Sequence, residues 1–180
     1  MTRQAGDILY FEGKQYLLNH YILDRYFLMH PDKKPLNDFV RTDMWRGYVA
    51  QFEIKDHQLF ALNKEYNFRD LFPNNGKLEW YSGLIRIDDF RDEFDLEPQN
   101  GIFEYLEILK GEFIQKRIFN FNELQQFKKE QYDYFLLSDE VESVYEFWRS
   151  NNENGLINID AINKIILENI MNYTEYVYVD

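Results

Sequence analysis

The chain has 180 residues, 45% hydrophobic and 18% aromatic, a composition that favours a folded protein with a substantial core. Its 32 acidic residues outnumber its 20 basic residues, and the formal charge of −12 argues against a protein that binds nucleic acid. Cysteine is absent, which excludes disulfides, thiolate metal ligands and cysteine nucleophiles. We find no apolar run of the ~20 residues that span a bilayer and no secretory signal, so we expect a cytoplasmic protein that does not bind membranes.

Residues 1–119 are predicted to form mostly β-strands joined by short turns. The first two strands are expected at 8–11 and 15–18, because Gly13 lies between two apolar segments and can adopt the positive φ of a tight hairpin turn. A short helix is expected at 22–29, where apolar residues recur at helical spacing.

The strongest strand signal lies at 48–54, where apolar and polar residues alternate. A period of two places alternate side chains on one face of a sheet, so we expect a core face made of Tyr48, Ala50, Phe52 and Ile54. After a turn at 55–57, further strands are predicted at 58–62, 77–87, 102–109 and 112–119. In the segment 77–87, one side is expected to carry Trp80, Ser82, Leu84 and Arg86.

Residues 120–172 change to helical periodicity. Asn120 or Asn122 can cap a first helix, with Glu123 or Gln125 three residues later as the reciprocal partner. Its moderate apolar stripe consists of Leu124, Phe127, Gln131, Tyr134 and Phe135. A second helix is expected to start at Ser138, with an apolar face of Val141, Val144, Tyr145 and Trp148. A third is expected at about 159–171, burying Ile162, Ile165, Ile166 and Ile170.

These elements predict one α+β domain over residues 1–180. A twisted antiparallel β-sheet of six to eight strands packs with the C-terminal helices, and the alternating tail at 173–180 is a candidate edge strand.

Two segments carry a resemblance to known sequences. The first reads Arg46-Gly47-Tyr48-x-Ala50-x-Phe52-x-Ile54, and the second reads Trp80-Tyr81-Ser82-Gly83-Leu84-Ile85-Arg86-Ile87. Together they resemble a family of uncharacterised bacterial proteins whose typical strings are Arg-Gly-Tyr-x-Ala-x-Trp-x-Ile and Trp-Phe-Ser-Gly-x-Leu-Arg-Ile. Phe52 replaces the usual Trp, and Tyr81 replaces the usual Phe. The resemblance covers about residues 8–118 and implies a β-rich fold; some such proteins look like members of toxin–immunity loci.

No motif for metal binding or catalysis is complete. A calcium loop starting at Ser150 would lack the acid at its first position and the bidentate Glu at its twelfth, where Ala161 stands. We therefore interpret 151–155 as a turn, and the six carboxylates of 88–97 as a solvated connection. The three histidines show no zinc-binding spacing. We expect no metal, no cofactor and no catalytic residues.

The uneven distribution of charge is the strongest functional signal. Residues 1–90 carry 12 bases and 13 acids, whereas residues 91–180 carry 8 bases and 19 acids. Such an excess supports solubility, and it also suits a surface that attracts a basic protein. The residues that we select for this surface are Asp133, Asp139, Glu140, Glu142, Glu146 and Glu153.

The favoured hypothesis is a non-enzymatic binding protein, most specifically an immunity protein that neutralises a basic toxin. The alternative is a small-ligand-binding protein or enzyme whose site lies in the concavity of the sheet, lined by Trp80, Tyr81 and Arg86. The sequence does not specify an oligomeric state.

Overall fold

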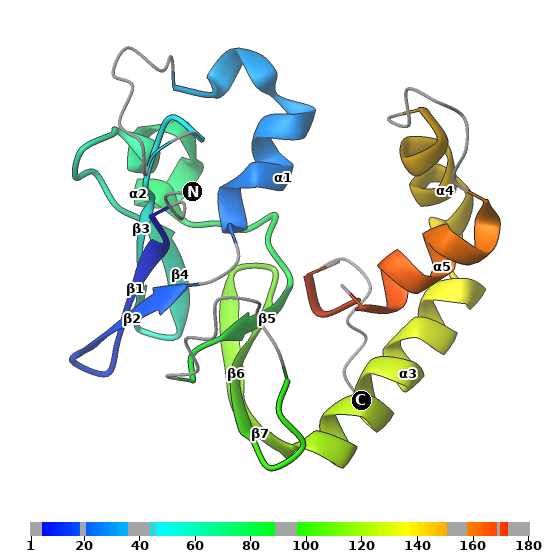
Figure 1. Cartoon of the computed structure of the whole chain (residues 1–180). Helices are drawn as coiled ribbons and strands as arrows, with labels where there is room; N and C mark the ends of the chain where they lie inside the picture. Colours follow the sequence, from blue (N-terminus) through cyan, green and yellow to red (C-terminus); the bar gives the residue numbers. More distant parts are fainter. Residues whose placement is uncertain are drawn as a thin grey trace.

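The computed structural model describes residues 5–18, 21–35, 44, 46–88, 97–150, 158–168 and 170–172, without the side chains of Leu28, Phe147 and Asn172 (Figure 1). Its seven strands form a single sheet in the order β2-β1-β3-β4-β7-β6-β5. The strands are β1 (Asp7–Phe11), β2 (Lys14–Leu18), β3 (Gln51–Lys55), β4 (Gln58–Ala61), β5 (Gly83–Arg86), β6 (Ile102–Leu109) and β7 (Glu112–Asn120). The expected α+β fold is confirmed.

One helix lies between the second and third strands, a short one lies between the fourth and fifth, and three helices follow the last strand. The α-helices are α1 (Ile22–Met29), the short α2 (Pro73–Gly76), α3 (Phe121–Leu137), α4 (Val141–Ser150) and α5 (Ile159–Glu168). Three 3₁₀ turns are also present: η1 (Pro31–Lys33), η2 (Phe68–Leu71) and η3 (Ile170–Asn172). In Figure 1, α3, α4 and α5 gather on one side of β5, β6 and β7.

Tight two-residue turns join three antiparallel pairs. Glu12-Gly13, Asp56-His57 and Lys110-Gly111 all have positive φ at both residues, which matches the right-handed twist of the strands that they connect. A Cβ at Gly111 would lie 2.7 Å from the Leu78 carbonyl oxygen, so this turn also requires glycine for space. The predicted hairpins around 12–14, 55–57 and 110–111 are confirmed.

One strand pair differs from the expected antiparallel arrangement. β1 and β3 are parallel, with Ile8, Leu9 and Tyr10 opposite Gln51, Phe52 and Glu53. A parallel pair needs a long crossover, which here includes α1. All other strand pairs are antiparallel.

The predicted strand at 77–87 is mostly wrong, since only Gly83–Arg86 is a strand. Before it, Leu78 donates its N–H to Leu59 at 3.0 Å, and Tyr81 accepts from the Gly111 N–H at 2.8 Å. A further bond, from the Tyr81 N–H to the Leu78 carbonyl at 2.9 Å, closes a turn, and Leu78 and Tyr81 are buried. Trp80 therefore does not share a face with Leu84.

Two cores lie on opposite faces of the sheet. The first contains α1, η2 and one face of the sheet, including the predicted face of Tyr48, Ala50, Phe52 and Ile54. The second lies between β5–β7 and the C-terminal helices. Neighbouring residues of β6 alternate between them, with Tyr105 in the second core and Leu106 in the first. The prediction of one domain stays a prediction, and 173–180 lies outside the described residues.

Candidate functional site

The helix α3, which carries the selected Asp133, starts at a capping box. The Asn120 side chain accepts a hydrogen bond from the Glu123 N–H at 3.0 Å, and the Glu123 carboxylate accepts one from the Asn120 N–H at 2.8 Å. This reciprocal pair satisfies two N–H groups that the helix itself cannot. The helix therefore begins directly at the end of β7.

The buried face of α3 determines which residues point outward. Leu124 and Phe135 are fully buried in the second core, and Lys128 and Gln131 are buried on the same face. Tyr134, which was expected on this stripe, is about half exposed. The outward face of the helix carries Asn122, Gln126, Glu130, Asp133 and Leu137, which are all exposed.

The second predicted helix starts later than expected. Ser138 ends α3 instead of capping α4, since its N–H donates to the Phe135 carbonyl at 3.0 Å. α4 begins at Val141, and the predicted apolar face is confirmed: Tyr145 is buried, with Val141, Val144 and Trp148 packed around it. The Tyr145 hydroxyl also donates to the Asn163 side chain on α5.

The selected acids occupy two helices and the connection between them. Asp133 lies on α3, Asp139 and Glu140 precede α4, and Glu142 and Glu146 lie on α4. These five side chains are exposed, and we call them the acidic surface. Glu153 lies outside the described residues.

The acids of this surface differ from several other acids of the chain in their ion pairing. Glu104 pairs with Lys116 at 3.0 Å, Glu107 pairs with Arg117 at 2.8 Å, and Glu97 pairs with Lys128. Within the described ranges, no such pair engages the carboxylates of Asp133, Asp139, Glu142 and Glu146. These four carboxylates therefore have no described cation paired with them, whereas cations neutralise Glu97, Glu104 and Glu107.

Apolar side chains lie beside these acids at the end of α3. Leu137 is 85% exposed, and Tyr134 and Leu136 are about half exposed. Their exposure follows from Phe135 taking the core-facing position, which turns its helical neighbours away from the core. None of the three was predicted to be exposed; the signal in the sequence was the pair Leu136-Leu137 directly before a predicted helix boundary.

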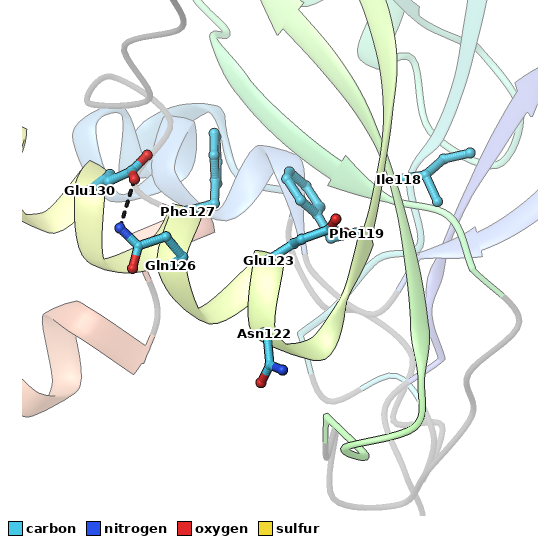
Figure 2. A pocket seen from close by; sticks show the side chains of 7 residues that line it. All are labelled: Ile118, Phe119, Asn122, Glu123, Gln126, Phe127 and Glu130. Atoms are coloured by element: carbon cyan, nitrogen blue, oxygen red, sulfur yellow. Dashed lines mark hydrogen bonds between the residues drawn. The ribbon is translucent and has the colours of Figure 1, made fainter.

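A groove of about 560 Å³ lies between β7 and the first half of α3. Figure 2 shows Phe119 and Phe127 side by side in it, while Ile118 points away to the other side of the strand. Further along the helix, the Glu130 carboxylate accepts a hydrogen bond from the Gln126 amide at 2.7 Å. The remaining lining residues are Asn122 and Glu123. The groove thus combines aromatic walls with carboxylates.

A second charged cluster borders the first core and contains the Arg46-Gly47-Tyr48 motif; its Asp7 and Arg46 side chains are buried, and its Asp24 side chain is about half exposed. The Arg46 guanidinium lies 3.1 Å from the Asp7 carboxylate and 3.0 Å from that of Asp24, between the rings of Tyr21 and Tyr48. The Tyr48 hydroxyl donates to Asp24 at 2.6 Å. These contacts join β1, α1 and the segment before β3, so the motif has a structural role here.

Burial raises the pKa of Asp7 from 3.8 to about 6, despite the opposing attraction of Arg46 and a hydrogen bond from the Ala50 N–H. The second oxygen of this carboxyl has no hydrogen-bond partner among the described residues. Burial also raises the pKa of the Tyr48 hydroxyl. Fully enclosed groups of this kind suit a structural tie better than a site that a ligand can enter.

The rings of Trp80 and Tyr81 contact each other, with their centroids 5.7 Å apart, but Arg86, the third residue of the alternative ligand site, lies on the other face of the sheet. Tyr81 is enclosed in the first core, where burial raises its pKa. Trp80 packs on Tyr26 and Phe72, whereas Arg86 lies over the Phe103 ring of the second core and pairs with Asp88.

No group of three His, Asp or Glu side chains in the described ranges could hold a metal ion, and the loop 151–157 lies outside those ranges. No helix among the described residues is long and apolar enough to cross a membrane.

Comparison with protein-family models, curated proteins and solved structures finds no match to this chain. The resemblance of the two motif segments to the uncharacterised bacterial family therefore stays a prediction.

Proposed function

We propose that the chain is a non-enzymatic protein that binds a basic partner protein through the acidic surface, most specifically as an immunity protein for a cationic toxin. The observation that carries this proposal is the set of exposed carboxylates on α3 and α4 without ion-pair partners among the described residues. Glu142 and Glu146 lie one turn apart on α4, where like charges slightly destabilise a helix. A binding role explains why such a pair is present.

The exposed apolar residues beside the acids support the same proposal. Interfaces commonly surround a few apolar contacts with charged groups, and Leu137 and Tyr134 offer such contacts next to Asp133. Acids of this kind steer a basic partner into the encounter complex, and the apolar contacts slow its release. The proposal retains a cytoplasmic location, for which the absence of cysteine is the support.

Co-expression with the product of the neighbouring gene tests the proposal. That product should be toxic alone and harmless with this protein. Reversing Glu142 and Glu146 to Lys should slow association by at least ~10-fold at low salt, because steering of this kind accounts for 10–10³-fold in rate. The effect should shrink toward 1 M salt, where the Debye length falls to about 3 Å.

A matched control reverses two exposed acids of the first half, Glu12 and Glu65, to Lys. This control changes the net charge by the same amount. A slower association that occurs only in the α4 variant is therefore caused by the acidic surface and not by total charge. Protection by the α4 variant equal to wild type would place the interface elsewhere. Failure of the wild-type protein to protect against a toxic neighbour would exclude the immunity function.

A further inference from the structure

One side of β7 is open along most of its length. On one side, β6 pairs with β7 along its whole length, from Ile102 opposite Asn120 to Leu109 opposite Glu112. On the other side, β4 pairs with β7 only where Gln58 lies opposite Glu112. The β3–β4 hairpin turns back at His57, whose carbonyl accepts the Phe113 N–H at 2.8 Å. Beyond that bond, no described strand adjoins residues 114–120 on this side, and β7 continues toward α3 (Figure 1).

The open side presents backbone groups that can bond another strand. Ile87 donates its N–H to the Glu104 carbonyl at 2.9 Å, so Glu104 bonds toward the β5 side of the sheet. Along a strand, successive residues direct their backbone N–H and C=O groups to opposite sides. Ile118 lies opposite Glu104, so its backbone groups point away from β6, and those of Lys116 do so too. Asn120 also points this way, but it donates its N–H to the first turn of α3. Lys116 and Ile118 therefore direct N–H and C=O groups to the open edge.

The groove beside α3 determines which side chains an added strand would carry. Successive side chains of a strand point to opposite faces, so alternate residues of the newcomer would enter the groove. There they would meet Phe119, then Phe127, over whose ring the Arg117 guanidinium already lies, and then the carboxylates of Glu123 and Glu130 (Figure 2). A Lys or Arg side chain fits both features, with its aliphatic part against the rings and its cation at the acids. On the other face, the exposed Ile118 favours an apolar neighbour.

We propose that the open edge of β7 binds an extended segment of a partner protein as an added strand, with Lys or Arg alternating with apolar residues. The inference rests on the proposed function, because it describes the segment by which a basic partner protein would bind: an extended strand that carries Lys or Arg. A second copy of this chain fits less well. Each copy carries a formal charge of −12, so two copies repel each other.

The test uses a peptide of about eight residues in which Lys and Val alternate, long enough to cover the edge. Titration into the isotopically labelled protein should slow hydrogen exchange of the Lys116 and Ile118 amides by ~10-fold or more. Ile118→Pro removes one outward N–H without cutting the β6 ladder, and it should weaken binding at least ~10-fold, or about 1.4 kcal/mol. Ile118→Thr loses the same apolar side chain but retains the N–H, so its affinity should stay within ~3-fold of wild type.

Thermal unfolding of both variants checks that the fold is intact. The inference is overturned if the peptide leaves both amides unprotected, if Ile118→Pro binds as well as Ile118→Thr, or if a Glu–Val peptide binds equally. Self-association of the wild type that Ile118→Pro abolishes would assign the edge to a second copy instead. A third result would separate the two proposals. If the protein protects against a toxin, reversal of Glu142 and Glu146 reduces that protection, and no peptide binds at β7, then the proposed function stands and this inference alone fails.

Discussion

Replacing Asp7 with Asn tests how burial and ion pairing compete in the first core. Asp7 is fully buried, and its pKa rises from 3.8 to about 6 because burial outweighs the attraction of Arg46. A raised pKa means that the folded protein binds this proton more tightly than the unfolded chain. The contribution of Asp7 to stability is therefore complete below pH 3.8 and is lost as the pH rises through about 6. A shift of about two pKa units corresponds to roughly 3 kcal/mol.

The measurement is urea unfolding of wild type and Asp7→Asn at a series of pH values. Asn does not titrate, so the wild-type free energy of unfolding minus that of the variant should fall by roughly 3 kcal/mol between about pH 3.5 and pH 7. Asp32→Asn, which removes an exposed carboxylate, should stay within about 0.5 kcal/mol of wild type. A constant difference would mean that the Arg46 pair cancels the effect of burial on the pKa of Asp7, and a difference that grows with pH would mean that the pair outweighs burial. Either result would refute the reasoning.

Two further predictions concern the helices, both measured by chemical unfolding. Asn120→Ala removes the capping box and should cost about 0.5–2 kcal/mol, whereas Asn122→Ala in the first turn should have a smaller effect. Phe135→Ala in the second core should cost about 3–5 kcal/mol, whereas Leu137→Ala on the exposed side should stay within about 0.5 kcal/mol of wild type. Equal costs at 135 and 137 would show that the outward face of α3 is wrongly assigned.

The hairpins could be predicted from sequence because their determinants are local. Gly13 and Gly111 supply positive φ between short apolar segments, and each strand pair follows directly from its turn. The capping box at Asn120 and Glu123 is equally local. Such signals need no knowledge of the rest of the fold.

The parallel pairing of β1 with β3 had no local signal. It depends on how α1 and the segment before β3 return the chain, and that path is stabilised by the buried pair of Asp7 and Arg46, which are distant in sequence. The segment 77–82 was misassigned for a related reason. Its backbone bonds to Leu59 and Gly111 come from other hairpins and override its strand-like composition.

The acids of α3 and α4 could be selected because helical register places them opposite the apolar stripes. That Asp133, Glu142 and Glu146 lack ion-pair partners among the described residues could not be predicted, because it depends on the side chains that surround them in the fold. Lys116, Arg117 and Lys128 pair instead with Glu104, Glu107 and Glu97. The open edge of β7 also could not be predicted from the sequence. Both strands of its hairpin were predicted, but the edge exists because β4 ends its pairing at Gln58.

The groove beside the open edge of β7 and one residue of the acidic surface, Asp133, lie along α3, and the two sites suit different stages of one binding event. Glu130 lines the groove, and Asp133 follows it by about one turn on the same outward face. Exposed charges act over about 10 Å at 0.1 M salt, so reversal of Glu142 and Glu146 should act mainly on the association rate. Backbone bonds at Ile118 form only on contact, so Ile118→Pro should act mainly on the dissociation rate. If both variants changed the same rate constant, one surface would be sufficient to explain binding, and the division of roles between α4 and β7 would be wrong.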